Sequence, residues 1–325
     1  MRTRPSLSVV IPTFQRPEWI GRAVASLDAQ SVQPDEVVVV VRDTDAPSHA
    51  AVDAVRRASH AFEVRQGVVS APGFMPPVER GFALARGEVV ATLDDDAEAF
   101  PDWAERILSH YDDPTVGAVG GRCINMHEGR PVPVEKTLAR VGYVTALGKV
   151  VGDMYKEPSF DAPVDADFLL GGCMSFRREI AQRLEFDLEL NRVVATGYEV
   201  DLGLQARNLG YRVIFDPKVA ILHYSAPRVI AGNRVPDDRE GVRWTSFNET
   251  RVMLRRGRGL RRAVFLTRAV LVGSRRVPGA LPLLLGPAAR RLGFLTSVAP
   301  AAMLGRAHAV ATVIRERLPS SRRAP

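Results

Sequence analysis

The sequence predicts an α/β fold with a doubly wound, mostly parallel sheet and a C-terminal basic amphipathic helical region. Short β-branched apolar runs, such as residues 7–11 (LSVVI) and 36–41 (EVVVVV), are typical of buried strands. Segments with apolar residues at helical spacing alternate with them, as in parallel sheets with helices on both faces. The 325 residues are 46% hydrophobic and 25% charged, which allows a sizeable core and excludes disordered, collagen-like and coiled-coil classes.

The N-terminal part alternates strand and helix in a regular order. The first strand, 7–11, stops at Pro12, and a helix over 17–30 begins at Pro17, a residue tolerated in a first helical turn. The same patterns predict further strands at 36–41, 62–64, 88–93 and 116–120, and further helices at 50–58, 78–85 and 100–111.

The periodicity weakens after residue 120. Residues 125–161 are rich in proline, glycine and mixed charge, which predicts a long excursion over the sheet. Order returns over 167–176, with helices predicted at 178–184 and 200–209 and strands at 212–215 and 219–223.

The charge is unevenly distributed along the chain. Residues 251–325 hold 16 arginines and one acidic residue, a net charge of +15, so residues 1–250 carry −8 of the total of +7. The two cysteines, Cys123 and Cys173, provide neither a disulfide framework nor a thiolate zinc site, which fits a reducing cytosol. The apolar runs 277–289 and 292–304 are too short to span a bilayer, and no secretion signal is predicted.

An acidic triplet, Asp94-Asp95-Asp96, directly follows the predicted strand 88–93. Ligands of open parallel sheets bind at the carboxyl ends of the strands. Carboxylates there suit Mg²⁺ or Mn²⁺, which bind through one or two carboxylates and substrate phosphates. The alternative is that these residues cap the next helix and interact with its dipole.

Two loops open at the same predicted edge of the sheet, after residues 11 and 41. Neither carries a glycine-rich phosphate-binding fingerprint, which argues against a dinucleotide dehydrogenase or a P-loop enzyme. Arg16 could pair with a diphosphate, and Asp43 could accept a hydrogen bond from a base. Each could equally be a solvated loop charge.

A second acidic pair, Glu199 and Asp201, lies near the start of the predicted helix at 200–209, and His223 ends the last predicted strand. A carboxylate beside a cleft could take a proton from an alcohol. The alternative is again a helix cap.

Five segments in this order resemble glycosyltransferase family 2 over about residues 6–224: LSVVIPTFQR, EVVVVVRDTDAPS, GFALARGEVVATLDDDAEAFPDW, FLLGGCMSFRREI and GYEVDLGLQARNLGYRVIFDPKVAILHY. The resemblance implies a GT-A catalytic domain over 1–230, with a nucleotide-binding half (about 1–120) and an acceptor-binding half (about 121–230). Residues 231–325 would be an Arg-rich helical extension. The implied reaction is inverting, non-processive transfer of a sugar from a nucleoside-diphosphate donor to a hydroxyl acceptor, in cell-envelope polysaccharide or glycolipid synthesis.

The resemblance also assigns residues. Asp94, Asp96 and His223 would hold Mg²⁺ or Mn²⁺, and Glu199 would be the catalytic base, with Asp201 as the other candidate. Gly171 and Gly172 would shape the acceptor site, where glycine allows close backbone approach. The nucleotide sugar would contact Pro12, Thr13, Arg16, Asp43, Arg80, Asp94 and Asp95.

The chain departs from the family pattern at three places. Where many members carry Ala-Arg-Asn, this chain has Pro77-Val78-Glu79, so the usual arginine is either missing or replaced by Arg80. The usual Glu-Asp pair reads Tyr198-Glu199, which lengthens the carboxylate by one methylene. The Q-x-x-R-W motif of processive synthases is reduced to Arg243-Trp244, which favours a non-processive enzyme.

Two other functions compete with this prediction. A sugar-1-phosphate nucleotidyltransferase would need a glycine-rich basic loop after the first strand, and PTFQRPEW is not one. A nucleic-acid-binding protein would fit the arginine-rich tail. The acidic body, and arginines interleaved with apolar residues, favour an anionic membrane surface instead, so no nucleic acid is expected.

We therefore expect a cytoplasmic protein, peripheral at the cytoplasmic face of the membrane, acting on a saccharide or lipid-linked acceptor. Residues 258–325 would supply the attachment. The residues expected to face the membrane are Leu260, Val264, Leu271, Leu283 to Leu285, Arg261, Arg262, Arg268, Arg275, Arg276, Arg290 and Arg291. The alternative is that these helices pack on the body or form an oligomer interface.

Overall fold

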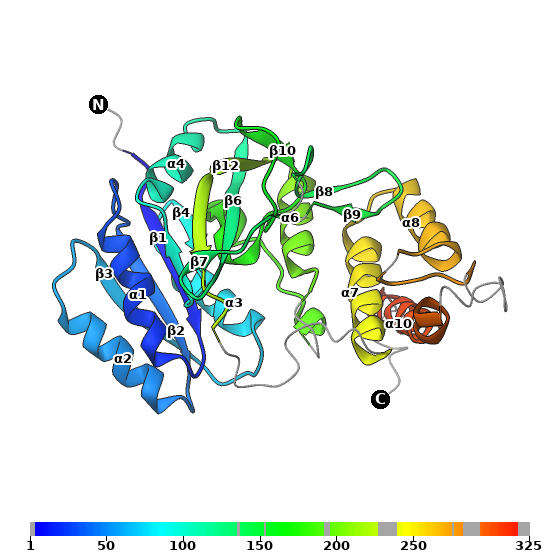
Figure 1. Ribbon diagram of the computed structural model, residues 1–325, viewed down its shortest axis with the longest axis horizontal. Coiled ribbons are helices and arrows are strands. Elements are labelled where there is room, and N and C mark those ends of the chain that lie inside the picture. The colour runs from blue at the N-terminus through cyan, green and yellow to red at the C-terminus, as the bar shows by residue number, and fades with distance from the viewer. Residues whose placement is uncertain are drawn as a thin grey trace. The chain divides into compact units, whose positions relative to one another are not determined.

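The computed structural model describes residues 4–134, 137–152, 154–191, 196–226, 239–274, 276–281 and 293–317 (Figure 1). The chain forms two compact units. The first comprises residues 1–143, 151–186 and 202–229, and the second comprises 144–150, 187–201 and 230–325. The second unit thus includes two segments from within residues 1–230. The roles expected from the sequence, a catalytic domain over 1–230 and an extension over 231–325, stay predictions.

The first unit is built on a mixed sheet that has ten strands in the described part of the chain. Its strands are β1 (Leu7–Thr13), β2 (Glu36–Arg42), β3 (Glu63–Val69), β4 (Val89–Thr92), β5 (Ala97–Ala99), β6 (Val116–His127), β7 (Arg130–Pro131), β10 (Val164–Ala166), β11 (Met174–Arg177) and β12 (Arg212–His223). They lie in the order β10-β12-β6-β11-β4-β1-β2-β3, with β5 beside β12 and β7 beside β6. A separate two-stranded ribbon pairs β8 (Tyr143–Val144) with β9 (Val150–Val151).

Parallel pairing runs through the half of the sheet that holds β1 to β4 and joins the two longest strands, β6 and β12, in the other half, where the short strands β5, β7 and β10 pair antiparallel. Strands β3, β2, β1 and β4 are parallel neighbours, and so are β6 and β12. Strand β11 runs antiparallel to both β4 and β6 and joins the two halves. The α/β class with a mostly parallel sheet is therefore confirmed.

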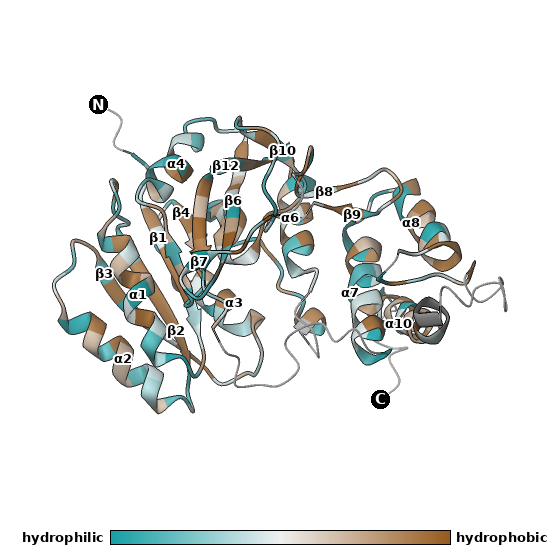
Figure 2. Cartoon of the chain, viewed as in Figure 1, coloured by the Kyte–Doolittle hydropathy of each residue, from teal (hydrophilic) through white to brown (hydrophobic). Residues whose placement is uncertain are grey.

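Helices cover both faces of the sheet. They are α1 (Pro17–Asp28), α2 (Ala46–Arg57), α3 (Met75–Leu84), α4 (Trp103–His110), α5 (Arg178–Ala181) and α6 (Tyr198–Asn208). Side chains of a strand alternate between faces, so Val9 and Ile11 join one core with Ile20 of α1 and Trp103 of α4. Val10 faces α3, where Gly81 leaves room for it: a Cβ there would lie 2.1 Å from Val10 Cγ1. Figure 2 shows how apolar the central strands are.

Several elements differ from the sequence-based expectation, β5, β6 and β12 among them. Strand β6 continues to His127, two residues beyond the expected start of the excursion at residue 125. Strand β12 is one strand rather than two, with an irregularity between Asp216 and Ala220. The short strand β5 was not predicted, because three residues carry too little pattern.

The second unit contains helices α7 (Arg239–Arg256), α8 (Leu260–Leu271) and α10 (Gly293–Arg317). Helices α7 and α10 pack closely at Gly305 of α10. A Cβ at this position would lie 2.1 Å from Arg243 O and Ser246 Oγ of α7, so the missing side chain allows the close approach. Val242, Val277, Val298 and Ala302 form its apolar core. The stretch Ser297–Arg317 is long and apolar enough to span a membrane by length and composition alone, and a buried core helix passes the same test.

Candidate active site

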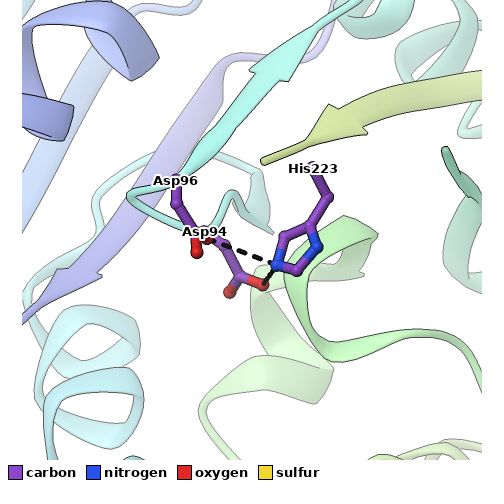
Figure 3. A group of neighbouring side chains, drawn as sticks. All are labelled: Asp94, Asp96 and His223. Carbon is purple, nitrogen blue, oxygen red and sulfur yellow. Dashed lines mark ion pairs between the residues drawn. The ribbon is translucent and has the colours of Figure 1, made fainter. Parts of the chain in front are cut away.

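The acidic triplet lies at the carboxyl edge of the sheet, as its sequence position predicts. Asp94, Asp95 and Asp96 follow β4, and His223 is the last residue of β12. Ligand atoms of Asp94, Asp96 and His223 all lie within 4.8 Å of one another (Figure 3). The sheet therefore brings together the three residues expected to hold a metal ion.

Asp96 is the most constrained member of this group. Its Oδ1 lies 3.3 Å from His223 Nε2, and its Oδ2 accepts a hydrogen bond of 2.9 Å from the Ala226 amide. His223 Nε2 also lies 4.0 Å from Asp94 Oδ2. The residues that follow β12 thus hold Asp96 in place, with its Oδ1 facing the imidazole.

Thr13, the last residue of β1, and Arg16, which follows that strand, both contact the triplet. Arg16 Nη1 donates to Asp95 Oδ1 at 2.9 Å and to Asp96 Oδ2 at 3.1 Å. Thr13 Oγ1 donates to Asp95 Oδ2 at 2.7 Å. A cationic side chain is therefore already aligned along two of the three carboxylates.

The shifted pKa values follow from burial and from these charges. Burial raises the pKa of Asp95 to about 7, although Arg16 and Thr13 act against that rise. Burial acts on Asp96 in the same direction, but His223, Arg16 and the Ala226 amide outweigh it and lower the pKa of Asp96. Burial lowers the pKa of Arg16, but Asp95 and Asp96 reverse the effect and raise it. The triplet therefore carries fewer than three full negative charges at neutral pH.

Gly172 gives Asp94 its place. It lies in the short 3₁₀ helix Gly171–Cys173, and a Cβ on it would lie 2.3 Å from Asp94 Oδ2. Thr92 Oγ1, at the end of β4, donates to the Gly171 carbonyl at 2.5 Å. The missing side chain at Gly172 therefore allows the Asp94 carboxylate to lie close to the backbone. A role of Gly171 and Gly172 toward an acceptor stays a prediction.

This donor set fits a divalent cation. Two carboxylates and one imidazole are oxygen and nitrogen ligands that Mn²⁺ accepts, and carboxylates with substrate phosphates suit Mg²⁺. The missing side chain at Gly172 leaves the Asp94 carboxylate room beside the other two ligands.

The remaining predicted donor-binding residues are placed less centrally. Pro12 is buried within β1, Asp43 is exposed just after β2, and Arg80 is exposed on α3. Asp45, which the sequence did not single out, accepts hydrogen bonds from the Gln15 amide at 2.5 Å and from the Ser48 amide at 3.3 Å. Gln15 has a positive φ of 54°, so Asp45 stabilises an unusual turn directly before Arg16.

Glu199 and Asp201 both lie in the first turn of α6, within the second unit. Asp201 is 1% exposed, and its two oxygens accept from Arg256 Nε at 2.8 Å and from Nη2 at 3.1 Å. Glu199 is half-buried. The geometry therefore gives Asp201 a structural partner, and the role of Glu199 as catalytic base stays a prediction.

Two further residues were missed by the sequence analysis. Asn125 Oδ1 lies 3.1 Å from His223 Nδ1, and the Ala226 amide binds Asp96. A backbone amide carries no sequence signal. Asn125 stood within a stretch expected to leave the sheet, so only the register of β6 against β12 could have identified it.

Comparisons with known proteins agree with this geometry. The Glycosyl transferase family 2 model matches residues 8–185, more than half of the chain. O-antigen biosynthesis protein RfbC of Myxococcus xanthus is 25% identical over 265 residues, 76% of this chain and 19% of that protein. Glucosyl-dolichyl phosphate glucuronosyltransferase of Haloferax volcanii is 32% identical over 125 residues, 36% of this chain and 38% of that protein. The chain thus spans less than half the length of either relative.

A solved structure shows the same fold. The mannosyltransferase PcManGT of Pyrobaculum calidifontis, in complex with GDP-Man and Mn²⁺, superposes with a TM-score of 0.55 and 19% identity, over 95% of this chain and 88% of that one. The family model, the order of the motifs and the shared GT-A fold lead to one conclusion: this chain belongs to glycosyl transferase family 2.

Proposed function

We propose that this enzyme transfers a sugar from a nucleoside-diphosphate donor to a hydroxyl acceptor, with inversion at the anomeric carbon. The observation that carries the proposal is the meeting of Asp94, Asp96 and His223 at the carboxyl edge of the sheet, with Arg16 beside them. Family membership favours this reaction over nucleotidyl transfer and over nucleic-acid binding.

Asp94, Asp96 and His223 would hold the divalent cation, which when bound offsets negative charge on the leaving diphosphate. Arg16 lies against Asp95 and Asp96, so its guanidinium can turn to a diphosphate that arrives there. Thr13 fixes the Asp95 carboxyl, which would face the sugar or ribose. The mannosyltransferase relative was solved with GDP-Man and Mn²⁺, which supports this assignment.

Glu199 would take the proton of the acceptor hydroxyl as its oxygen attacks the anomeric carbon from the face opposite the diphosphate. One displacement of this kind inverts the configuration. Changing Glu199 to Gln keeps the size and removes the base, so turnover should fall by about 10²–10⁴-fold while donor affinity stays the same.

A direct test is a screen of UDP-, GDP- and dTDP-linked sugars with Mn²⁺, scored by release of the nucleoside diphosphate. The variants Asp94→Ala and Asp96→Ala should abolish release and Mn²⁺ binding without unfolding the chain, because both residues follow a strand end. Asp53→Asn, at an exposed position on α2, is the matched control. Normal activity of Asp96→Ala, or insensitivity to EDTA, would refute the metal assignment.

The acceptor we propose is a saccharide or a lipid-linked glycan of the cell envelope. One relative is named for O-antigen biosynthesis, and another for a glucosyl-dolichyl phosphate substrate. A lipid-linked acceptor would be met at the membrane surface on the cytoplasmic side, so peripheral attachment belongs to the same proposal.

The attachment would lie on α8 and the turn after it. Leu260 is 78% exposed, Leu271 53% and Val272 57%, and Arg261 and Arg276 are exposed nearby in the sequence. Apolar side chains flanked by arginines suit an anionic lipid interface.

Not every arginine of this region is available for such a surface. Arg268 donates to Leu147 O at 3.0 Å and to Gly273 O at 2.9 Å, and Arg306 is buried. Val264 is half-buried, as is Arg262, which donates to Gly257 O at 2.6 Å. Arg275, Leu283 to Leu285, Arg290 and Arg291 lie outside the described residues.

Vesicle co-sedimentation tests the attachment. Binding should require anionic lipid, weaken at high salt and fall in the variants Leu260→Ser/Leu271→Ser and Arg261→Gln/Arg276→Gln. The change Val132→Ser, at an apolar residue that is 44% exposed in the first unit, is the control. Equal binding to neutral vesicles would contradict the proposal, as would equal binding by all variants.

A further inference from the structure

Helix α7 contacts residues 187–191 and 196–201 along one of its sides. Asn248, Arg251 and Arg255 recur at a spacing of three and four residues, which places them on the same side of a helix. The described residues 187–191 and 196–201, here called the base-bearing segment, include Glu199 and belong to the same compact unit as α7.

The start of the base-bearing segment is held by a buried ion-pair cluster. Asp187 accepts from Arg251 Nε at 2.6 Å and from Nη2 at 3.0 Å, and Arg255 Nη1 lies 2.6 Å from Asp187 Oδ2. Arg251 is 2% exposed and also reaches Glu316 of α10 at 2.5 Å. An acidic side chain buried this way is fixed by its partners.

The middle of the segment is held through backbone carbonyls. Asn248 Nδ2 donates to Leu190 O at 3.2 Å and to Thr196 O at 2.9 Å. Gly197 follows with a φ of +84°, which turns the chain into α6. Asn248 therefore fixes the backbone three residues before Glu199.

The end of the segment is held by Arg256, whose fork binds both oxygens of Asp201. Residues two positions apart on a helix point in directions about 200° apart. With Asp201 bound to α7, Glu199 leaves α6 on a different side from Asp201, and it is half-buried. The bidentate pair thus sets the orientation of the first turn of α6.

We propose that Arg256, at the end of α7, is a positioning residue that aims the Glu199 carboxylate by locking Asp201. This inference rests on the proposed function, in which Glu199 is the base. It gives the arginine-rich C-terminal region a role in turnover that is separate from any attachment to a membrane. Arg256 touches neither donor nor acceptor in this account and acts only through α6.

The test compares Arg256→Gln and Arg256→Lys with Arg239→Gln, a change at an exposed arginine in the first turn of the same helix. The assay is release of nucleoside diphosphate from the donor that the parent chain hydrolyses fastest in Mn²⁺. We expect kcat of Arg256→Gln to fall about 10–100-fold, the scale of a misplaced catalytic group. Calorimetry should show that Arg256→Gln binds Mn²⁺ together with GDP or UDP as tightly as the parent chain does. Lysine, which keeps the charge but not the fork, should give an intermediate kcat.

A double variant separates positioning from general damage. If Arg256 acts through Glu199, Glu199→Gln/Arg256→Gln should be no slower than Glu199→Gln alone. If the losses in kcat of the two single variants multiply in the double variant, the proposal is overturned. An unchanged kcat in Arg256→Gln would also overturn it. Should Arg256→Gln fail to fold, Arg256→Lys decides: a kcat equal to the parent overturns the proposal.

The same assay distinguishes failure of the inference from failure of the proposed function. A fully active Glu199→Gln would remove the base assignment itself. An inactive Glu199→Gln beside a normal Arg256→Gln would remove only the positioning role.

Discussion

The side chain of Asn125 holds the imidazole of His223: Asn125 Oδ1 lies 3.1 Å from His223 Nδ1. The two residues are paired in the register of β6 and β12. An Nδ1–H donated to this oxygen leaves Nε2, which faces Asp94 and Asp96, to serve as a ligand.

Replacing Asn125 by Ala should therefore weaken Mn²⁺ binding about 10–100-fold, the usual effect of removing a partner of a metal-binding histidine. Calorimetric titration with Mn²⁺ measures it without any substrate. His127→Ala, at an exposed position at the end of the same strand, should leave the affinity unchanged. An Asn125→Ala protein with parental affinity would show that the hydrogen bond is dispensable.

Gly172→Ala should displace the Asp94 carboxylate, because the new Cβ would lie 2.3 Å from Asp94 Oδ2. We expect turnover to fall about 100-fold, the cost of a shift on the order of 1 Å at a reacting site. Gly21→Ala is a matched control, since a Cβ at Gly21 on α1 meets nothing within 4 Å. Steady-state turnover together with Mn²⁺ titration would check the pair, and full activity of Gly172→Ala would contradict the crowding argument.

Arg251→Met should destabilise the chain by about 3–5 kcal/mol, because it leaves Asp187 buried with part of its charge uncompensated. Urea unfolding followed by circular dichroism gives the difference. The double variant Arg251→Met/Asp187→Leu should recover much of the loss, since no unpaired buried acid remains. A double variant less stable than the single one would count against this explanation.

His60 makes part of the stability depend on pH. Both ring nitrogens face acceptors, with Nδ1 2.9 Å from the Asp28 carboxylate and Nε2 2.9 Å from Val55 O. Burial lowers the pKa of His60, but the hydrogen bond with Asp28 and its charge outweigh burial and raise it. A raised folded pKa means that the stabilisation is complete below the unfolded value near 6.5 and is lost as pH rises through the folded value.

Asp28→Asn should therefore lower the melting temperature more at about pH 5.5 than at about pH 8.5. Thermal unfolding of both proteins across that range gives the comparison, and Asp53→Asn on α2 serves as the control. A difference that grows with rising pH would reverse the sign and refute the pairing.

The sequence predicts the candidate metal ligands better than it predicts the residues that hold those ligands in place. Asp94 and Asp96 follow an apolar run, and parallel strands end at a common edge, so their place could be predicted from pattern alone. His223 was assigned from its resemblance to the family. Asn125 could not be found, because it meets His223 through the register of two strands whose paired residues are 98 positions apart.

The arginines of the C-terminal region show the same limit. Charge predicts an exposed position for Arg251, and its burial depends on Asp187, 64 residues earlier in the chain. The antiparallel direction of β11 is also invisible locally, because its four residues, MSFR, are too few to indicate the direction of a strand. Contacts distant in sequence decide these features.

The division of the second unit into three separate stretches has a consequence for biosynthesis. Strands β1 to β4 find their partners in the order in which a ribosome releases them, and they can assemble early. The loop around Asp187 must wait until α7 has left the exit tunnel, and Arg251 cannot reach Glu316 before α10 is translated. A nascent chain that stops short of α10 can already form the contact between Arg251 and Asp187, but the pair between Arg251 and Glu316 forms only once α10 has emerged.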